Sequence, residues 1–319
     1  MTLFYLLVLA IVAVSAFLIG KRIVTAKVLR QQHTDKQPLG RQHMDMAAPY
    51  QLVKARYGWL LANPNDLYLG RAIIEYGEYS ELESRFLADL PNIRPGTVVE
   101  VGANAGLLTI PLAQALAAAG REMIAIEPQP FLFQNLCANL ALNGLSNVRA
   151  WPWACGSEQA TLYFPRQNYA ALGNFGGVEM VDASSSASVA VPCMLLDDVV
   201  GTTTVSLIKI DVEGAELEVL KGASALIAAS RPVLYMENDR LDKSQALIEW
   251  LMAHNYRLWW HLTPLFNADN FFGTLVNLYD DAHSLNMLCL PREFEMPDIP
   301  LTEITDATSH PFSVAEKTS

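Results

Sequence analysis

Two apolar runs of the sequence each end in acidic side chains. Asp211 closes the run VSLIKID (205–211), and Glu237 with Asn238 closes PVLYMEN (232–238). If these runs are neighbouring parallel strands, their carboxyl ends meet at one edge of a sheet, where open α/β sheets bind ligands. Two carboxylates and an amide oxygen suit Mg²⁺ or a similar ion, which would lower the pKa of a substrate hydroxyl. Without an ion, Asp211 or Glu237 could act as a general base; the alternative is that these acids only cap helices or bind water.

Glu213 and Glu216 follow Asp211 within the sequence DVEGAE (211–216). The pattern predicts that a helix begins here. Both carboxylates would then lie in its first turn, where the positive end of the helix dipole stabilises negative charge. We therefore expect a structural role for Glu213 and Glu216, and a place in the crevice for Asp211.

A glycine-rich segment, EVGANAG (100–106), follows another apolar run. Gly102 and Gly106 let the backbone turn sharply and approach a ligand closely, and the next helix would present unpaired N–H groups. A dinucleotide fingerprint, G-x-G-x-x-G, would need glycine where Asn104 and Leu107 stand, and the sequence holds no Walker-type G-K-[S/T]. The turn therefore predicts a nucleotide cofactor without pyrophosphate; a plain tight turn is the alternative.

Glu127 ends the run MIAIE (123–127). A carboxylate there can accept hydrogen bonds from both hydroxyls of a ribose. Because the glycine-rich turn and Glu127 follow adjacent strands in the right order, together they indicate a nucleoside site more specifically than either does alone.

These segments belong to a regular alternation of strands and helices from about residue 95. Strands are expected at 97–101, 123–127, 147–155, 205–211, 232–238, 256–262 and 285–290. The alternation predicts an α/β fold: a doubly wound, mostly parallel, Rossmann-like sheet with helices on both faces. The last two strands have no helix between them and could be antiparallel, and 161–164 with 189–196 could form a hairpin. We expect this domain to span 96–296, after a helical extension over 46–95 and before a flexible tail over 297–319.

The N-terminal segment is uncharged and almost wholly apolar from Thr2 to Gly20. A helix of this length, about 19 residues, spans a bilayer core. Residues 21–41 then carry six basic residues and one acidic residue, a net charge of +5. A signal peptide would carry its positive charge before the apolar run, and a buried core helix is the other alternative. With the positive-inside rule, the sequence predicts a single-pass membrane protein with an anchor over 1–20, a basic juxtamembrane linker over 21–45 and a cytoplasmic catalytic domain.

The composition and net charge limit the partners and ligands that the chain could bind. The chain carries a net charge of −11 and has a pI near 5.0, so nucleic acid is a poor partner. The apolar content of 51% excludes general disorder. The cysteines, Cys137, Cys155, Cys193 and Cys289, form no C-x-x-C pair, which argues against a zinc site or a disulfide framework.

Over roughly residues 96–240 the chain resembles the FkbM family of S-adenosylmethionine-dependent methyltransferases. The matching stretches are VVEVGANAGLLTIPLA, IAIEPQPFLFQNLCANLALNG, LDD, SLIKIDVEGAELEVLKGA and RPVLYMEN. The sequence IKIDVEGAE with its LKG continuation is the most specific of these. The resemblance implies a class I methyltransferase fold and S-adenosylmethionine as the cofactor.

The resemblance also implies roles for particular residues. The cofactor would be bound by Glu100, Gly102, Ala103, Asn104, Gly106, Glu127, Pro128, Asn174 and Asp211. The sequence NFGG (174–177) resembles a family segment near the active centre, and Asp197 of the LDD sequence would join Asp211 and Glu237 as a catalytic carboxylate. The family more usually has Asp at position 100. Glu100 offers the same hydrogen-bond-accepting carboxylate on a side chain that is one methylene longer.

The reaction implied is methyl transfer to an oxygen of a glycan, a lipid-linked sugar or a natural-product-like small molecule, which the anchor would bring close. The segment 260–285, which is rich in aromatics, asparagine and histidine, could shape the acceptor pocket, and its His261 and His283 are further candidate bases. Two alternatives stay open. An NAD-dependent oxidoreductase shares the fold class but would need the missing fingerprint, and a non-catalytic, membrane-tethered scaffold is disfavoured by the intact Glu127 and Asp211.

Overall fold

The structure is a computed structural model that describes residues 43–45, 49–181, 187–294 and 300–312, all within one compact unit. Among these residues, no helix combines the length and the apolar character needed to cross a membrane. The longest have 13 residues, about 20 Å against a hydrocarbon core of about 30 Å. We therefore correct the prediction of a single-pass membrane protein; the anchor predicted over 1–20, and nearly all of the linker predicted over 21–45, lie outside the described residues.

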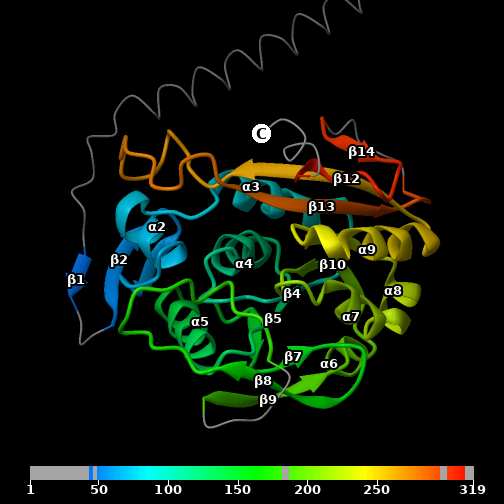
Figure 1. Cartoon of the computed structure of the whole chain (residues 1–319), viewed down its shortest axis with the longest axis horizontal. Helices are drawn as coiled ribbons and strands as arrows, with labels where there is room; N and C mark the ends of the chain where they lie inside the picture. The colour runs from blue at the N-terminus through cyan, green and yellow to red at the C-terminus, as the bar shows by residue number, and fades with distance from the viewer. Residues whose placement is uncertain (1–42, 46–48, 182–186, 295–299, 313–319) are drawn as a thin grey trace, which may run out of the picture. The chain divides into compact units, whose positions relative to one another are not determined.

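The central sheet has the strand order β14-β12-β13-β11-β10-β4-β5-β6 (Figure 1). Its strands are β4 (Thr97–Val101), β5 (Met123–Ile126), β6 (Val148–Trp151), β10 (Val205–Ile210), β11 (Val233–Glu237), β12 (Tyr256–Pro264), β13 (His283–Pro291) and β14 (Thr302–Ile304). The strands from β11 to β6 in this order run parallel, whereas β13, β12 and β14 are antiparallel to their neighbours. The predicted α/β fold with a mostly parallel sheet is confirmed, as is the antiparallel pairing of β12 with β13.

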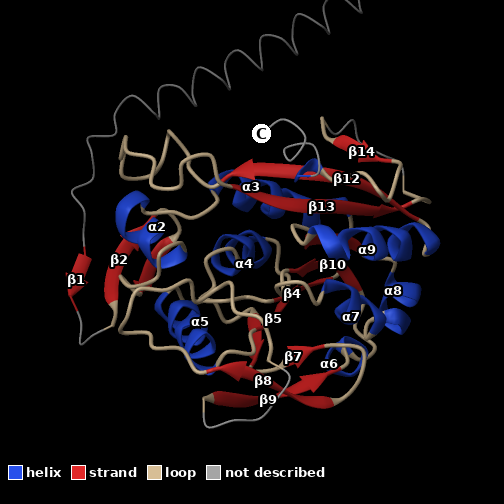
Figure 2. Cartoon of the chain, viewed as in Figure 1, coloured by secondary structure: helices blue, strands red, loops and turns tan. Residues whose placement is uncertain are grey.

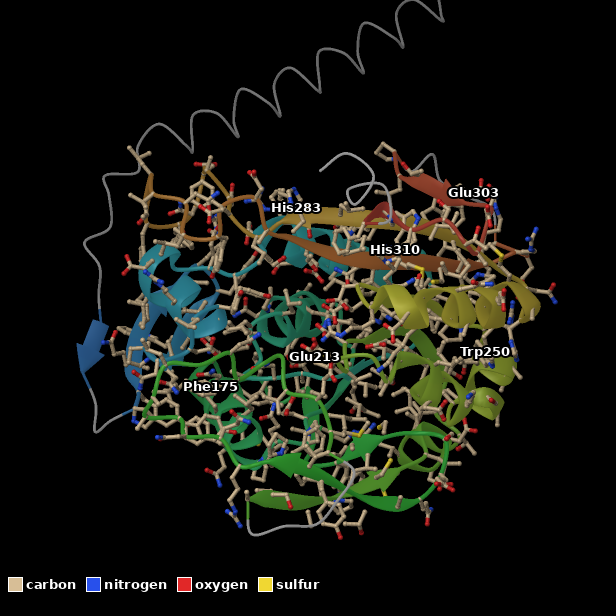
Figure 3. All side chains as sticks on the ribbon, viewed as in Figure 1. Phe175, Glu213, Trp250, His283, Glu303 and His310 are labelled. Carbon is tan, nitrogen blue, oxygen red and sulfur yellow. The ribbon has the colours of Figure 1, made fainter. Side chains whose placement is uncertain are left out.

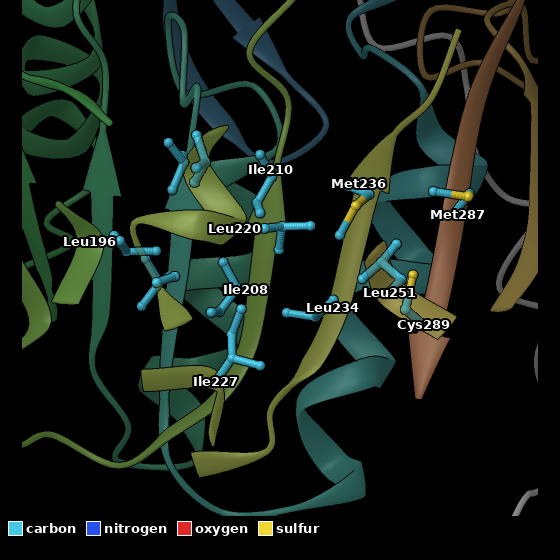
Figure 4. Packing of buried hydrophobic residues seen from close by; sticks show 14 of the residues in the cluster. Leu196, Ile208, Ile210, Leu220, Ile227, Leu234, Met236, Leu251, Met287 and Cys289 are labelled. Atoms are coloured by element: carbon cyan, nitrogen blue, oxygen red, sulfur yellow. The ribbon is translucent and has the colours of Figure 1, made fainter. Parts of the chain in front are cut away.

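Helices cover both faces of this sheet (Figure 2). They are α2 (Leu69–Tyr76), α3 (Glu81–Asp89), α4 (Thr109–Ala118), α5 (Pro130–Leu142), α6 (Leu196–Val200), α7 (Glu216–Lys221), α8 (Ser224–Ser230) and α9 (Leu241–Ala253), with a 3-10 turn at Leu90–Ile93. On one face, helices α6 to α9 pack on alternate strand residues such as Ile208 and Ile210 (Figure 4). On the other face, α3 and α4 pack on Leu207 and its neighbours. Since successive strand residues face opposite sides, Lys209 lies on the α3 and α4 side.

The extension over 46–95 was predicted to be helical, but its described part begins with a β-hairpin. Strands β2 (Gln51–Ala55) and β3 (Gly58–Ala62) are antiparallel, and β1 (His43–Asp45) pairs with β2. Asn139 of α5 and Asn143, which directly follows this helix, bind the free edge of β3. Asn139 Oδ1 accepts the N–H of Leu61 at 2.7 Å, and Asn143 Oδ1 accepts that of Trp59 at 3.0 Å. The hairpin therefore depends on a tertiary contact that the local sequence does not reveal.

The tail predicted to be flexible, residues 297–319, is packed in its described part. Strand β14 pairs with β12 and buries Ile304. His310 is also buried, with its ring 5.3 Å from that of Trp260 and its Nε2 atom 3.0 Å from the carbonyl oxygen of Asn238. These residues therefore extend and cover the sheet.

The chain between β6 and β10 forms a separate three-stranded sheet with the order β7-β9-β8. Its strands are β7 (Ala154–Cys155), β8 (Ala160–Pro165) and β9 (Ser188–Met194). The predicted pairing of 161–164 with 189–196 is confirmed, because β8 and β9 are antiparallel partners.

Candidate active site

The glycine-rich turn after β4 lies directly against the end of β10. Gly102 has a φ of +85°, and a Cβ atom there would lie 1.7 Å from the carbonyl oxygen of Asp211. The N–H groups of Gly102 and Ala103 both donate to the carbonyl of Ile126 at 2.9 Å, which ties the turn to β5. The close approach of three strand ends therefore requires glycine at position 102.

Asn104 and Gly106 complete the turn in different ways, both with positive φ. The backbone N–H of Asn104 donates to Glu127 Oε2 at 2.8 Å, and Asn104 lines the cleft described next. Gly106 was predicted to line the cofactor pocket, but it is not among the lining residues. A Cβ atom there would lie 2.8 Å from Leu136 Cδ1, so Gly106 serves the packing of the turn on α5.

A cleft opens above these strand ends. A cavity of about 360 Å³ lies over the turn and the ends of β10 and β11, and a second of about 210 Å³ extends toward β7. The two cavities share Gly102, Glu127, Gly176, Asp211 and Glu213, so they form one continuous cleft. Of the predicted cofactor residues, the first cavity is lined by Glu100, Gly102, Ala103, Asn104, Glu127, Asn174 and Asp211, and the second by Gly102, Glu127, Pro128 and Asp211.

Glu127 lies buried where the two cavities meet. Its two carboxylate oxygens accept the N–H groups of Asn104 and Gln129, each at 2.8 Å. Burial raises the pKa of Glu127 to about 7, although these two hydrogen bonds act in the opposite direction. A carboxylate has about four acceptor positions, so Glu127 can still accept hydrogen bonds from a ligand in the cleft.

Glu100 is fully buried on the floor of the cleft. Its Oε2 atom accepts the hydroxyl of Thr109 at 2.6 Å, and its Oε1 atom lies 3.5 Å from Lys209 Nζ. The same ammonium group lies 3.2 Å from Asp211 Oδ2. Lys209 therefore links two of the predicted site carboxylates, a contact that their sequence spacing does not show.

Asp211, Glu213 and Glu237 form a cluster whose carboxylate oxygens lie within 4.8 Å of one another. Glu213, labelled in Figure 3, has a φ of +56° and precedes α7, so the prediction that it lies in the first helical turn is wrong. Its carboxylate lines the cleft and pairs with Arg240, while burial raises its pKa to about 7. The Glu237 Oε2 atom is buried and has no hydrogen-bond partner among the described residues, and burial followed by Asp211 raises the pKa of Glu237.

Asn238 and Glu216 have structural roles. The Asn238 side chain was predicted to bind a metal beside Glu237, but it donates to Met287 Sδ at 3.2 Å, away from the cluster. Adjacent residues at a strand end point to opposite sides, which explains the error. Glu216 begins α7 as predicted, and its Oε1 atom accepts two backbone N–H groups of the preceding loop, at 3.2 and 3.0 Å.

Asp197 was predicted to be catalytic, but it does not line the cleft. It lies in α6, and its carboxylate accepts the N–H groups of Ala225 and Leu226 at 3.1 and 2.8 Å. These are free N–H groups in the first turn of α8, so Asp197 caps that helix from outside it.

Replacing Asp197 with alanine should therefore lower the free energy of unfolding by about 1–2 kcal/mol and leave ligand binding in the cleft unchanged. Urea unfolding and calorimetry would measure the two effects. Asp198→Ala, which removes a more exposed neighbouring carboxylate, is the matched control. A loss of cleft binding at unchanged stability would contradict this assignment.

Residues 174–180 cross the cleft and line both cavities. Asn174 Oδ1 accepts the N–H of Gly177 at 3.1 Å, which fixes a tight turn in this segment. Glu179, further along, lies 3.3 Å from the guanidinium of Arg240. The NFGG segment therefore lies at the cleft, and its role near an active centre stays a prediction.

The outer wall of the first cavity comes from the segment 260–285, which was predicted to shape the acceptor pocket, and from the N-terminal extension. This wall is formed by Tyr68, Leu69 and Tyr79 of the extension and by Leu265, Ala282, His283 and Ser284 near the ends of β12 and β13. His283, labelled in Figure 3, is thus at the cleft. His261 is buried instead, 2.9 Å from the Tyr235 hydroxyl, and burial lowers its pKa to about 4. The aromatic-rich composition of both segments was the available signal, but only tertiary packing brings them to one wall.

The chain matches known methyltransferases. Residues 100–261 match the family model described as the methyltransferase FkbM domain. The chain is 32% identical over 175 residues to methyltransferase sdnD of Sordaria araneosa, covering 45% of this chain and 67% of that protein. It is 28% identical over 144 residues to methyltransferase 1 of Beauveria bassiana, covering 39% of this chain and 57% of that protein. A solved FkbM methyltransferase from Methylobacillus flagellatus aligns with a TM-score of 0.41 and 17% identity over 63% of this chain, which spans 47% of that protein.

Proposed function

Because the chain belongs to the FkbM family of methyltransferases, we propose that it transfers a methyl group from S-adenosylmethionine to a hydroxyl oxygen of a small molecule or glycan. The observation that carries this proposal is the continuous cleft that joins the turn at Gly102, the carboxylate of Glu127 and the acidic cluster around Asp211. Membership of a methyltransferase family also argues against the NAD-dependent oxidoreductase.

The residues present fit S-adenosylmethionine along the length of the cleft. Pro128 and Trp153 offer apolar surface for an adenine in the second cavity. Glu127, where the cavities meet, is placed to accept hydrogen bonds from ribose hydroxyls. The turn at Gly102 and the floor carboxylate of Glu100 would hold the methionine portion.

The protein does not need to activate the methyl group, because bound S-adenosylmethionine supplies one that is already activated by its sulfonium. The protein has to hold an acceptor hydroxyl in line, exclude water and take up the hydroxyl proton. Glu237 is well suited to the last task, since its Oε2 atom is buried without a hydrogen-bond partner among the described residues and its pKa is raised. Asp211 lies beside it as the second acceptor.

A divalent cation at Asp211, Glu213 and Glu237 is an alternative way to activate the hydroxyl. The three carboxylates offer oxygens within 4.8 Å of one another, and hard cations prefer such ligands. The unpartnered Glu237 Oε2 atom supports this placement. A cation here would lower the pKa of the acceptor hydroxyl.

The charge of the cleft favours an uncharged acceptor rich in hydroxyl groups. Carboxylates of Asp211, Glu213, Glu237 and Asp239 line the acceptor side, and each accepts hydrogen bonds from hydroxyls but repels anions. Arg240, which could attract an anion, is already paired with Glu213, Asp239 and Glu179. This supports a sugar or a polyhydroxylated small molecule.

Titration calorimetry with S-adenosylhomocysteine, and with NAD for comparison, tests the cofactor assignment. We expect the homocysteine compound to bind and Glu127→Gln to weaken binding about 10–100-fold, the value of charge-assisted hydrogen bonds. Wild-type affinity should rise about fivefold from pH 6 to pH 8, because Glu127, with a pKa of about 7, is protonated below and ionised above that value. Glu122→Gln, at an exposed carboxylate, is the control. Binding of NAD alone, or of neither compound, would refute the proposal.

A further inference from the structure

The floor of the cleft contains one ammonium group among several buried carboxylates. Lys209 is only 2% exposed, and its Nζ atom lies 3.2 Å from Asp211 Oδ2 and 3.5 Å from Glu100 Oε1. Both of these carboxylates line the cleft, Glu100 from β4 and Asp211 from the end of β10. Lys209 and Glu100 are direct partners in the pairing of these two strands.

A third buried carboxylate lies near this lysine without forming a direct ion pair with it, and it comes from outside the region that matches the family model. Glu83 belongs to α3 and is 3% exposed. Burial lowers the pKa of Lys209, but Asp211, Glu100 and Glu83 together outweigh burial and raise it. Ser80 fixes Glu83 through a hydrogen bond of 2.8 Å to Oε2, and Asn286 lies 3.3 Å from its Oε1 atom.

We infer that Lys209 is a positioning residue that holds Glu100 and Asp211 side by side beneath the methionine portion of the cofactor, and that buried Glu83 of the N-terminal extension adds a third negative charge near them. Three carboxylates around one buried site repel one another strongly unless a cation separates them. Without Lys209 the floor would have to open or take up protons. The extension therefore contributes to the cofactor site as well as to packing, an inference that rests on the proposed function.

The test is a double-mutant cycle on S-adenosylhomocysteine affinity, with thermal unfolding measured for every variant. Lys209→Met, which keeps the volume and removes the charge, should weaken binding at least tenfold. Glu83→Gln in the same chain should recover most of this loss, because one of the repelling charges is gone. Glu83→Gln alone completes the cycle, and the sum of the two single losses should exceed the loss in the double variant. Lys221→Met, at an exposed pair with Glu218, is the matched control and should change nothing.

Recovery in the double variant supports the inference. If Lys209→Met folds, the double variant should bind S-adenosylhomocysteine more tightly than Lys209→Met does. If Lys209→Met does not fold, the double variant should fold. Three results would overturn the inference. These are wild-type affinity in Lys209→Met, a loss of affinity that Glu83→Gln does not reverse, and failure of both Lys209→Met and the double variant to fold. If the wild-type chain itself does not bind S-adenosylhomocysteine, the proposed function fails first.

Discussion

Replacing Asp211 with asparagine is expected to lower kcat by about three orders of magnitude. Asp211 belongs to the cluster in which a hydroxyl proton is taken up or a cation is held, and its carbonyl oxygen packs on the Gly102 turn. Asparagine keeps the size of the side chain and the backbone contact, so the loss of affinity for S-adenosylhomocysteine should stay well below the loss of kcat. Transfer of a tritiated methyl group to an acceptor found by screening glycosides and polyhydroxylated compounds measures the rate.

Two controls are needed to interpret this experiment. Asp242→Asn makes the same change at an exposed carboxylate in the first turn of α9 and should leave the rate unchanged. Treatment of the wild-type enzyme with EDTA separates the two ways of activating the hydroxyl: loss of activity that Mg²⁺ restores indicates a cation, and unchanged activity indicates a carboxylate base. An Asp211→Asn enzyme with more than a tenth of wild-type activity would exclude Asp211 from both roles. Absence of methyl transfer by the wild-type chain to every compound would favour the non-catalytic scaffold.

Gly102→Ala is expected to destabilise the protein by about 2–5 kcal/mol and to abolish S-adenosylhomocysteine binding. The new Cβ atom would lie 1.7 Å from the carbonyl oxygen of Asp211, a backbone atom that cannot rotate away, and the residue would also have to adopt a φ of +85°. The cost combines left-handed strain of about 1–2 kcal/mol with overpacking of about 1–3 kcal/mol. Denaturant unfolding followed by circular dichroism measures the first effect, and calorimetry measures the second.

Gly120→Ala is the matched control for this substitution. Gly120 has a similar positive φ of +66°, but a Cβ atom there would meet nothing within 4 Å. We expect only the strain cost of about 1–2 kcal/mol and wild-type binding. Equal losses in the two variants would show that backbone strain, and not the contact between β4 and β10, makes Gly102 necessary.

Local sequence patterns predicted the parts of the fold that depend on local periodicity. The runs that became β4, β5, β10 and β11 are short, apolar and rich in β-branched residues, and helices separate most of them, so a parallel sheet with covered faces followed. The predictions failed where a distant partner decides the structure. The β2–β3 hairpin is bound by asparagines in and directly after α5, and β14 exists because it pairs with β12.

For the site, the sequence determined which residues stand at strand ends, and it could do so because parallel strands bring their carboxyl ends to one edge. Glu100, Gly102, Glu127, Asp211 and Glu237 all line the cleft for this reason. It also determined the family, through the run that contains Asp211 and Glu213.

Only the tertiary structure decided where each side chain points and which segments close the site. A turn with positive φ at Glu213 brings that residue into the cluster, while the alternation of a strand end turns Asn238 out of it. Asp197 caps a neighbouring helix instead of facing the cleft. Glu83, 126 positions before Lys209, lies near it only because α3 packs on the sheet. Spacing along a chain fixes periodicity and order, but the direction of a side chain and its distant neighbours follow from packing, which is a property of the whole fold.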